Sequence, residues 1–121
     1  MKVICTQKAL ADGLKAVAGL VSKKRIPLPI LANVLLATDE GRLKLTVSDL
    51  ESFLSLWIGA MVEEEGAITL PVHMFRDVVS ALPDDRLTLS ADARMATVLC
   101  GSTEQVLSGL KADDFPPTPR I

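Results

Sequence analysis

The feature that most constrains the fold is an element order that occurs twice along the 121 residues, once in each half. In the first half, a strand over residues 2–5 precedes a helix over 7–21 and strands over 33–38, 43–48 and 53–62. In the second half, a strand over 67–70 precedes a helix over 71–82 and strands over 87–90, 95–100 and 105–110. This duplicated β-α-β-β-β order predicts an α+β domain, with two antiparallel four-stranded sheets and both helices on one side.

The two helices are predicted from apolar stripes at helical spacing. Thr6 can cap the first helix, and Pro71 suits a first helical position in the second. The stripes are Leu10, Leu14, Val17, Ala18 and Val21 in the first helix, and Phe75, Val78, Val79 and Leu82 in the second. The nearly continuous apolar content of residues 53–62 predicts one strand that is buried on both faces. The aromatic residues fall at apolar-periodic positions and are interpreted as core: Phe53, Trp57, Phe75 and Phe115.

Charge is distributed unevenly along the chain, although the formal net charge is only −2. Residues 1–25 contain six basic residues and one acidic residue, whereas the remainder is strongly acidic. An acidic total argues against a free-standing nucleic-acid binder, but a locally basic segment is compatible with a geometry-controlled contact to a polyanion. The alternative is a solvated basic helix and loop.

No catalytic or metal-binding motif is apparent in the sequence. His73 is the single histidine, and it falls on an expected polar helix face with no nucleophile constrained beside it. Cys5 and Cys100 have no metal-ligand spacing and are interpreted as small buried residues, so we expect neither a metal nor a cofactor. Asp49 and Glu51 could share one face at a strand end. They leave open a remote alternative, a small enzyme that uses this carboxylate pair.

An ordered set of motifs resembles the first domain of the bacterial sliding clamp, the beta subunit of DNA polymerase III. The motifs are Leu28-Pro29-Ile30-Leu31 with Asn33, Gly41-x-Leu43-x-Leu45, Asp49-Leu50-Glu51, Leu70-Pro71, Leu82-Pro83 and Asp114-Phe115-Pro116. They span essentially the whole chain in unbroken order. The resemblance implies the DNA-clamp fold over residues 1–115, with 116–121 as the start of a linker to second and third domains.

The resemblance further implies a ring of two such proteins around duplex DNA, which tethers the replicative polymerase without any chemistry of its own. Polymerase and clamp loader would bind through domains that this chain does not contain, and the protein would be cytoplasmic. The implied contacts to DNA phosphates are Lys23, Lys24 and Arg25, with Lys8, Lys15, His73 and Arg76 as weaker candidates. Relatives often have arginine at the position of His73. This departure weakens the expectation that the second helix contacts DNA.

The resemblance places the subunit junction at the last strand, against the third domain of the other subunit. The expected interface residues are Glu104, Gln105, Val106, Leu107 and Ser108, with Val78 as an apolar support. The competing interpretation is a dimerisation or scaffold domain that is unrelated to DNA.

Overall fold

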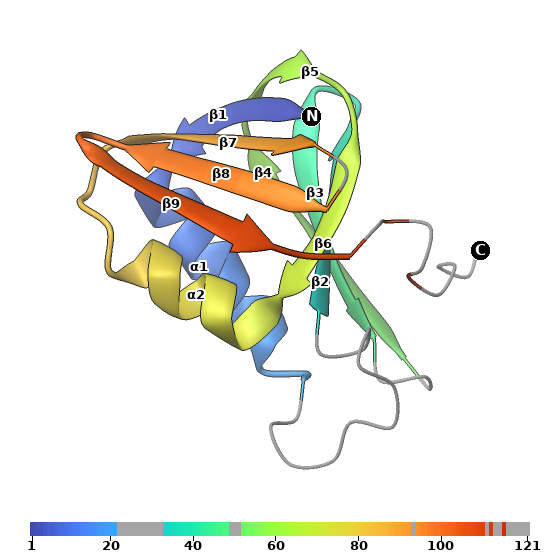
Figure 1. Cartoon of the computed structure of the whole chain (residues 1–121). Helices are drawn as coiled ribbons and strands as arrows, with labels where there is room; N and C mark the ends of the chain where they lie inside the picture. Colours follow the sequence, from blue (N-terminus) through green and yellow to red (C-terminus); the bar gives the residue numbers. More distant parts are fainter. Residues whose placement is uncertain (22–32, 49–51, 93, 111, 113–114, 116–121) are drawn as a thin grey trace.

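The computed structural model describes residues 1–21, 33–48, 52–92, 94–110, 112 and 115. Two antiparallel sheets meet at an angle, and two helices lie side by side against them on one side (Figure 1). The predicted α+β architecture is therefore confirmed. The core fills the space between the helices and the inner faces of both sheets.

The first sheet has five strands rather than the expected four, in the order β5-β1-β7-β8-β9. Its strands are β1 (Lys2–Thr6), β5 (Met61–Glu64), β7 (Arg86–Asp92), β8 (Met95–Cys100) and β9 (Thr103–Ser108). The additional strand arises because the predicted strand over 53–62 divides at Ala60. Its first part stays in the second sheet, and its last part crosses to pair with β1.

The second sheet has the order β4-β3-β2-β6. Its strands are β2 (Asn33–Asp39), β3 (Arg42–Ser48), β4 (Phe53–Gly59) and β6 (Ala67–Pro71). The hairpin between β2 and β3 turns through Glu40 and Gly41, which have φ angles of 49° and 77°. Positive φ at both central residues of a two-residue loop is typical of a type I′ turn.

The helices are α1 (Gln7–Ala18) and α2 (Val72–Ser80), each shorter than predicted. Thr6 caps α1 as expected, because its hydroxyl accepts a hydrogen bond of 3.2 Å from the backbone N–H of Ala9. Pro71 instead ends β6 and occupies the N-cap position of α2 without a side-chain bond. Gly13 lets α1 approach β4 closely, since a Cβ there would lie 3.2 Å from Leu56 Cδ1.

The prediction that Trp57 belongs to the core is wrong. Its side chain is 42% exposed on the outer face of the second sheet, while Leu56 and Ile58 on either side pack against the core. The indole N–H donates to Asp39 Oδ2 at 2.8 Å. The cationic ends of Arg42 and Lys44 lie 5.5 and 5.2 Å from the ring centroid. These contacts fix the ring between charged groups on an exposed sheet face.

Candidate functional site: the helix pair and the open sheet edges

Two side-chain hydrogen bonds fasten the helices together, one at each end of the pair. Gln7, at the start of α1, donates from Nε2 to the carbonyl of Val79 near the end of α2 at 2.8 Å, and this bond is buried. His73, in the first turn of α2, places Nε2 3.0 Å from the carbonyl of Val21, just beyond α1. The helices are therefore antiparallel. Because a carbonyl can only accept, Nε2 of His73 carries the proton in this bond.

The exposed face of α1 carries two lysines, Lys8 and Lys15, with the acidic Asp12 between them. A separation of seven residues is two helical turns, so the two lysines share one face about 10 Å apart along the helix axis. Neither forms an ion pair with another residue in the part of the chain that the structure describes. The structure thus brings together two of the predicted cationic residues.

The predicted site residues on α2 are Arg76 and His73. Their side chains are less available for contact with a phosphate than the two lysines of α1. The Arg76 side chain is 23% exposed, and its Nε and Nη2 both lie 3.1 Å from Asp77 Oδ1. His73 is half-buried between the helices, at the opposite end of α1 from Lys8. Its Nδ1 is buried and has no partner among the described residues. Lys23, Lys24 and Arg25 lie outside the described residues.

The last strand, β9, forms an edge of the first sheet and pairs only with β8. Four of the five predicted interface residues are exposed, namely Glu104, Gln105, Val106 and Ser108, and Val106 is 55% exposed. The side chain of Leu107 points inward and is only 6% exposed. Val78 on α2 is half-buried against the core. An aspartate at Leu107 would therefore disrupt the core as well as any interface.

The structure also shows a second exposed edge that the sequence analysis did not identify. Strand β4 pairs only with β3, so one side of its backbone has no strand neighbour among the described residues. Alternation within residues 53–59, with Leu54, Leu56 and Ile58 on one face and Trp57 on the other, indicates an exposed face but not that the strand lies at an edge. Edge strands present unpaired backbone groups that can pair with another sheet.

The described residues show no arrangement suited to catalysis or to metal binding. No three His, Cys, Asp or Glu side chains among them gather to hold a metal ion. Burial raises the pKa of Cys5 to about 11, with a smaller contribution from the nearby Cys100. Burial also raises the pKa of Cys100, whose thiol donates to the carbonyl of Pro83 at 3.3 Å. Both cysteines are therefore held as unreactive thiols at neutral pH. Asp49 and Glu51 fall outside the described residues.

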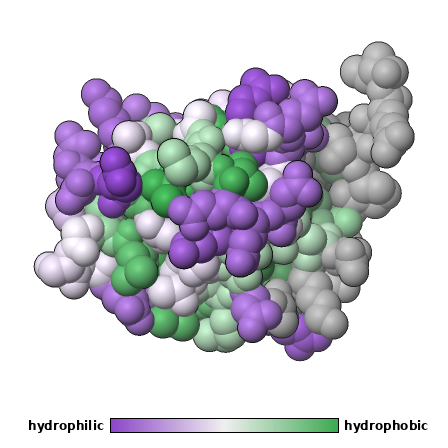
Figure 2. Space-filling view, turned by 90° about the horizontal axis from the view of Figure 1, so that it is seen from above, coloured by the Kyte–Doolittle hydropathy of each residue, from purple (hydrophilic) through white to green (hydrophobic). Residues whose placement is uncertain are grey.

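In the view from above (Figure 2), the hydrophobic side chains of the described residues appear between hydrophilic groups. No helix in the described ranges is both long enough and apolar enough to cross a membrane. The main structural features are thus an antiparallel helix pair with two free lysines and two sheets with open edges.

Comparison with known proteins identifies relatives of this chain. The beta sliding clamp of Synechococcus elongatus is 42% identical over 124 residues, which cover 100% of this chain and 33% of that protein. The beta sliding clamp of Streptomyces coelicolor is 33% identical, again over 100% of this chain and 32% of its own length. The chain thus spans about a third of the length of these relatives.

Solved structures lead to the same group of proteins. The DNA polymerase III subunit beta from Pseudomonas aeruginosa superposes with a TM-score of 0.91 at 33% identity, over 99% of this chain and 33% of that one. The pol III beta of Caulobacter crescentus gives a TM-score of 0.91 at 31% identity, over 98% of this chain and 32% of that one. Residues 1–119 match the family described as the DNA polymerase III beta subunit, N-terminal domain. The chain therefore belongs to the DNA polymerase III beta subunit family and corresponds to its N-terminal domain.

Proposed function

We propose that this chain is the first domain of a ring-shaped sliding clamp that encircles duplex DNA and makes a replicative polymerase processive. The observation that carries the proposal is the family match over residues 1–119, together with a fold that leaves a strand edge open on each sheet. The clamp has no chemistry of its own, and it works in the bacterial cytoplasm. Polymerase and clamp loader bind to the parts of the longer relatives that this chain does not cover.

The helix pair is the proposed inner surface of the ring. Lys8 and Lys15 are exposed and unpaired among the described residues, so both can reach phosphate oxygens. The basic sequence at Lys23, Lys24 and Arg25 is the strongest remaining candidate for phosphate contact, by resemblance. Arg76 contributes less because Asp77 already neutralises part of its charge. His73 acts through the helix pair rather than on DNA.

A sliding ring needs contacts that carry no sequence information. Phosphate contacts meet this requirement because their energy varies little from one base pair to the next. A bidentate contact to a base would add roughly 1–3 kcal/mol of preference for particular sites. Enclosure then keeps the protein on DNA without tight binding. An acidic chain with a few lysines that face the hole of the ring is therefore suited to sliding.

The proposed ring closes through edge strands. Strand β9 pairs with the third domain of the other subunit, with Val106 and its exposed neighbours in the junction, while Val78 supports the strand from α2. The open edge at β4 suits the junction with the next domain of the same chain. Both junctions would extend an antiparallel sheet across a boundary between domains.

A chimera tests this assembly. Residues 1–121 replace the matching first third of the Synechococcus elongatus clamp, and sedimentation equilibrium gives the mass of the product. We expect a dimer of the chimera and a monomer of the 121-residue chain alone, which should also bind duplex DNA too weakly to detect at physiological salt. A cooperatively folded chimera that stays monomeric where the parent clamp is dimeric would exclude the proposed junction.

A further inference from the structure

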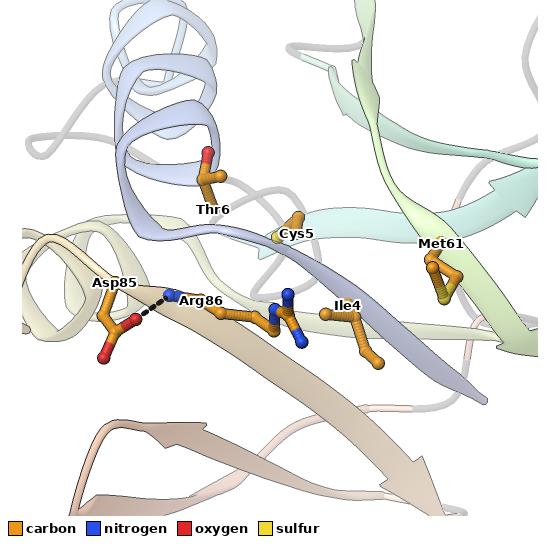
Figure 3. Close-up of a pocket in the computed structure, with 6 residues that line it drawn as sticks. All are labelled: Ile4, Cys5, Thr6, Met61, Asp85 and Arg86. Carbon is orange, nitrogen blue, oxygen red and sulfur yellow. Dashed lines mark hydrogen bonds between the residues drawn. The ribbon is translucent and has the colours of Figure 1, made fainter.

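A notch lies beside β1 where its neighbour on one side ends. Strand β1 pairs with β7 along its whole length, but it pairs with β5 only at Lys2, Val3 and Ile4. Beyond Ile4, Cys5 and Thr6 have no strand on that side within the described residues. An open depression of about 670 Å³ lies at this point (Figure 3), lined by Ile4, Cys5, Thr6, Met61, Asp85 and Arg86.

The floor and one wall of this notch are apolar. The half-buried Ile4 lies opposite Met61 in the register of β1 and β5, and Met61 is 64% exposed, the largest exposure among the large hydrophobic side chains described. The side chain of Cys5 is buried beneath them. An apolar side chain placed here would remove Met61 and Ile4 from water, and burial of apolar surface is favourable.

Arg86 supplies an unpaired positive charge to the same notch. It lies opposite Thr6 in the register of β1 and β7, and its side chain extends so that the guanidinium lies beside Ile4 (Figure 3). The guanidinium has no ion pair or hydrogen bond with any described residue. The adjacent carboxylate of Asp85 accepts a bond of 2.7 Å from the backbone N–H of Arg86 instead.

The start of α1 also favours negative charge in the notch and so opposes the effect of Asp85, which lines it too. Thr6 lines the notch and is the N-cap of this twelve-residue helix, whose first turn contains no acidic residue. Helix N-termini favour negative charge. The notch therefore combines an apolar surface, a free guanidinium and a helix N-terminus.

We propose that this notch binds a short extended segment of a partner protein that carries an acidic side chain two residues from a large apolar one. Alternate side chains of an extended chain share one face about 7 Å apart, so the carboxylate can reach Arg86 while the apolar group packs on Ile4 and Met61. The segment lies along the open side of β1 at Cys5 and Thr6, in the manner of strand addition. This contact requires neither DNA nor a closed ring.

The test uses labelled hexapeptides and the isotopically labelled 121-residue chain. The acidic pair consists of Gly-Ser-Leu-Thr-Glu-Ser and the same six residues in reverse order. The matched pair has the same two sequences with lysine in place of glutamate. We expect saturable binding of the acidic pair, with amide chemical-shift changes centred on Ile4, Thr6, Met61 and Arg86. The lysine peptides should bind less tightly.

Substitutions then identify the groups responsible. Arg86→Gln should weaken binding of the acidic peptides about twofold to fivefold, as expected for the loss of an exposed ion pair. Arg86→Glu should reverse the preference in favour of lysine, and Met61→Ser should weaken both pairs. Arg94→Glu is the matched control, because Arg94 is exposed beyond the other end of β7, and this change should have no effect.

Three results would overturn the proposal. They are the absence of saturable binding, chemical-shift changes away from the notch, and binding that Arg86→Glu leaves unchanged. Self-association of the unliganded chain that Arg86→Glu abolishes would instead assign the notch to a second copy of the chain. Failure here would leave the sliding-clamp proposal intact, because that proposal is tested by the mass of the chimera.

Discussion

At the scale of single residues, Gln7 and His73 hold the helix pair in register. Each forms a side-chain bond to a backbone carbonyl of the other helix or just beyond its end. The bond from Gln7 is the second at the Val79 carbonyl, which also accepts from the backbone N–H of Leu82 at 3.1 Å. The relative position of α1 and α2 thus depends on two polar contacts as well as on the apolar core.

Replacement of Gln7 tests the first of these contacts. Gln7→Leu keeps the volume of the side chain similar but removes one of the two hydrogen bonds at the Val79 carbonyl. We expect the free energy of unfolding in urea to fall by about 0.5–1.5 kcal/mol, the usual net contribution of one hydrogen bond. Lys8→Ala, at the adjacent exposed position, should change it by less than about 0.5 kcal/mol. Equal effects of the two substitutions would show that the contact does not stabilise the pair.

Cys5 gives a pH dependence with a defined sign. Burial raises its pKa to about 11 in the folded protein, whereas the unfolded thiol titrates near 9. The folded state therefore favours the neutral thiol. This contribution to stability is complete below about pH 9 and is lost as pH rises towards 11.

The prediction is a steeper loss of stability at high pH in the wild-type chain than in Cys5→Ala. Between pH 8.5 and 11 the difference in the change of unfolding free energy should be on the order of 1–3 kcal/mol. Urea titrations at several pH values measure it. Parallel pH profiles for the two proteins would mean that Cys5 titrates similarly when folded and unfolded.

At the scale of elements, β9 is the strand on which assembly of the proposed ring depends. In the chimeric clamp, Val106→Asp places a charge on the exposed side of this edge and should raise the dimer dissociation constant at least tenfold. The unfolding free energy of the 121-residue chain should change little because Val106 is largely exposed. Leu107→Asp should instead destabilise the chain by several kcal/mol, since it buries an unpaired charge. Dimerisation unaffected by Val106→Asp would exclude β9 from the junction.

A separate prediction concerns DNA binding by the exposed face of α1. In the chimeric clamp, replacement of both Lys8 and Lys15 by alanine should weaken duplex binding equally on unrelated sequences. The slope of log affinity against log salt should become shallower by about one to two units, because each phosphate contact contributes about 0.9. Lys44→Ala is the matched control, since Lys44 lies beside Trp57 on the outer sheet face. A slope unchanged by the double substitution would remove α1 from the DNA interface.

Most of the element order could be predicted from the sequence because local patterns determine it. The helical stripes and the Thr6 cap depend on residues that are near neighbours in the chain. The division of 53–62 into β4 and β5 could not be predicted, because it depends on which sheet each part pairs with. Continuous apolar content also concealed the outward position of Trp57, whose ring is held by cations from the neighbouring strand.

The candidate site was only partly accessible to sequence analysis. Exposed lysines at seven-residue spacing were correctly placed on a polar helix face, and the exposed residues of β9 were found. The inward direction of Leu107 follows from the register with Ala96 on β8, which no local pattern specifies. The contact between His73 and Val21 joins residues 52 positions apart and depends on how the helices pack.

At the scale of the whole molecule, the domain has one helical side and two sheets whose edges remain open. A single such domain cannot surround a duplex, and its net charge of −2 provides little attraction to DNA. In the proposed clamp, residence on DNA would therefore come from the topology of the assembled ring. This requirement separates a clamp from an ordinary binding domain, which dissociates from linear and circular DNA alike.

The most direct test of this claim loads the chimeric clamp on nicked circular DNA with the Synechococcus elongatus clamp loader and then cuts the circle once. We expect the chimera to stay on the intact circle through gel filtration and to be lost within minutes of linearisation, as the parent clamp is. Capping both new DNA ends with bulky protein blocks should restore retention. Equal retention on circular and open linear DNA would contradict encirclement, as would failure of a dimeric chimera to remain on the circle where the parent clamp remains.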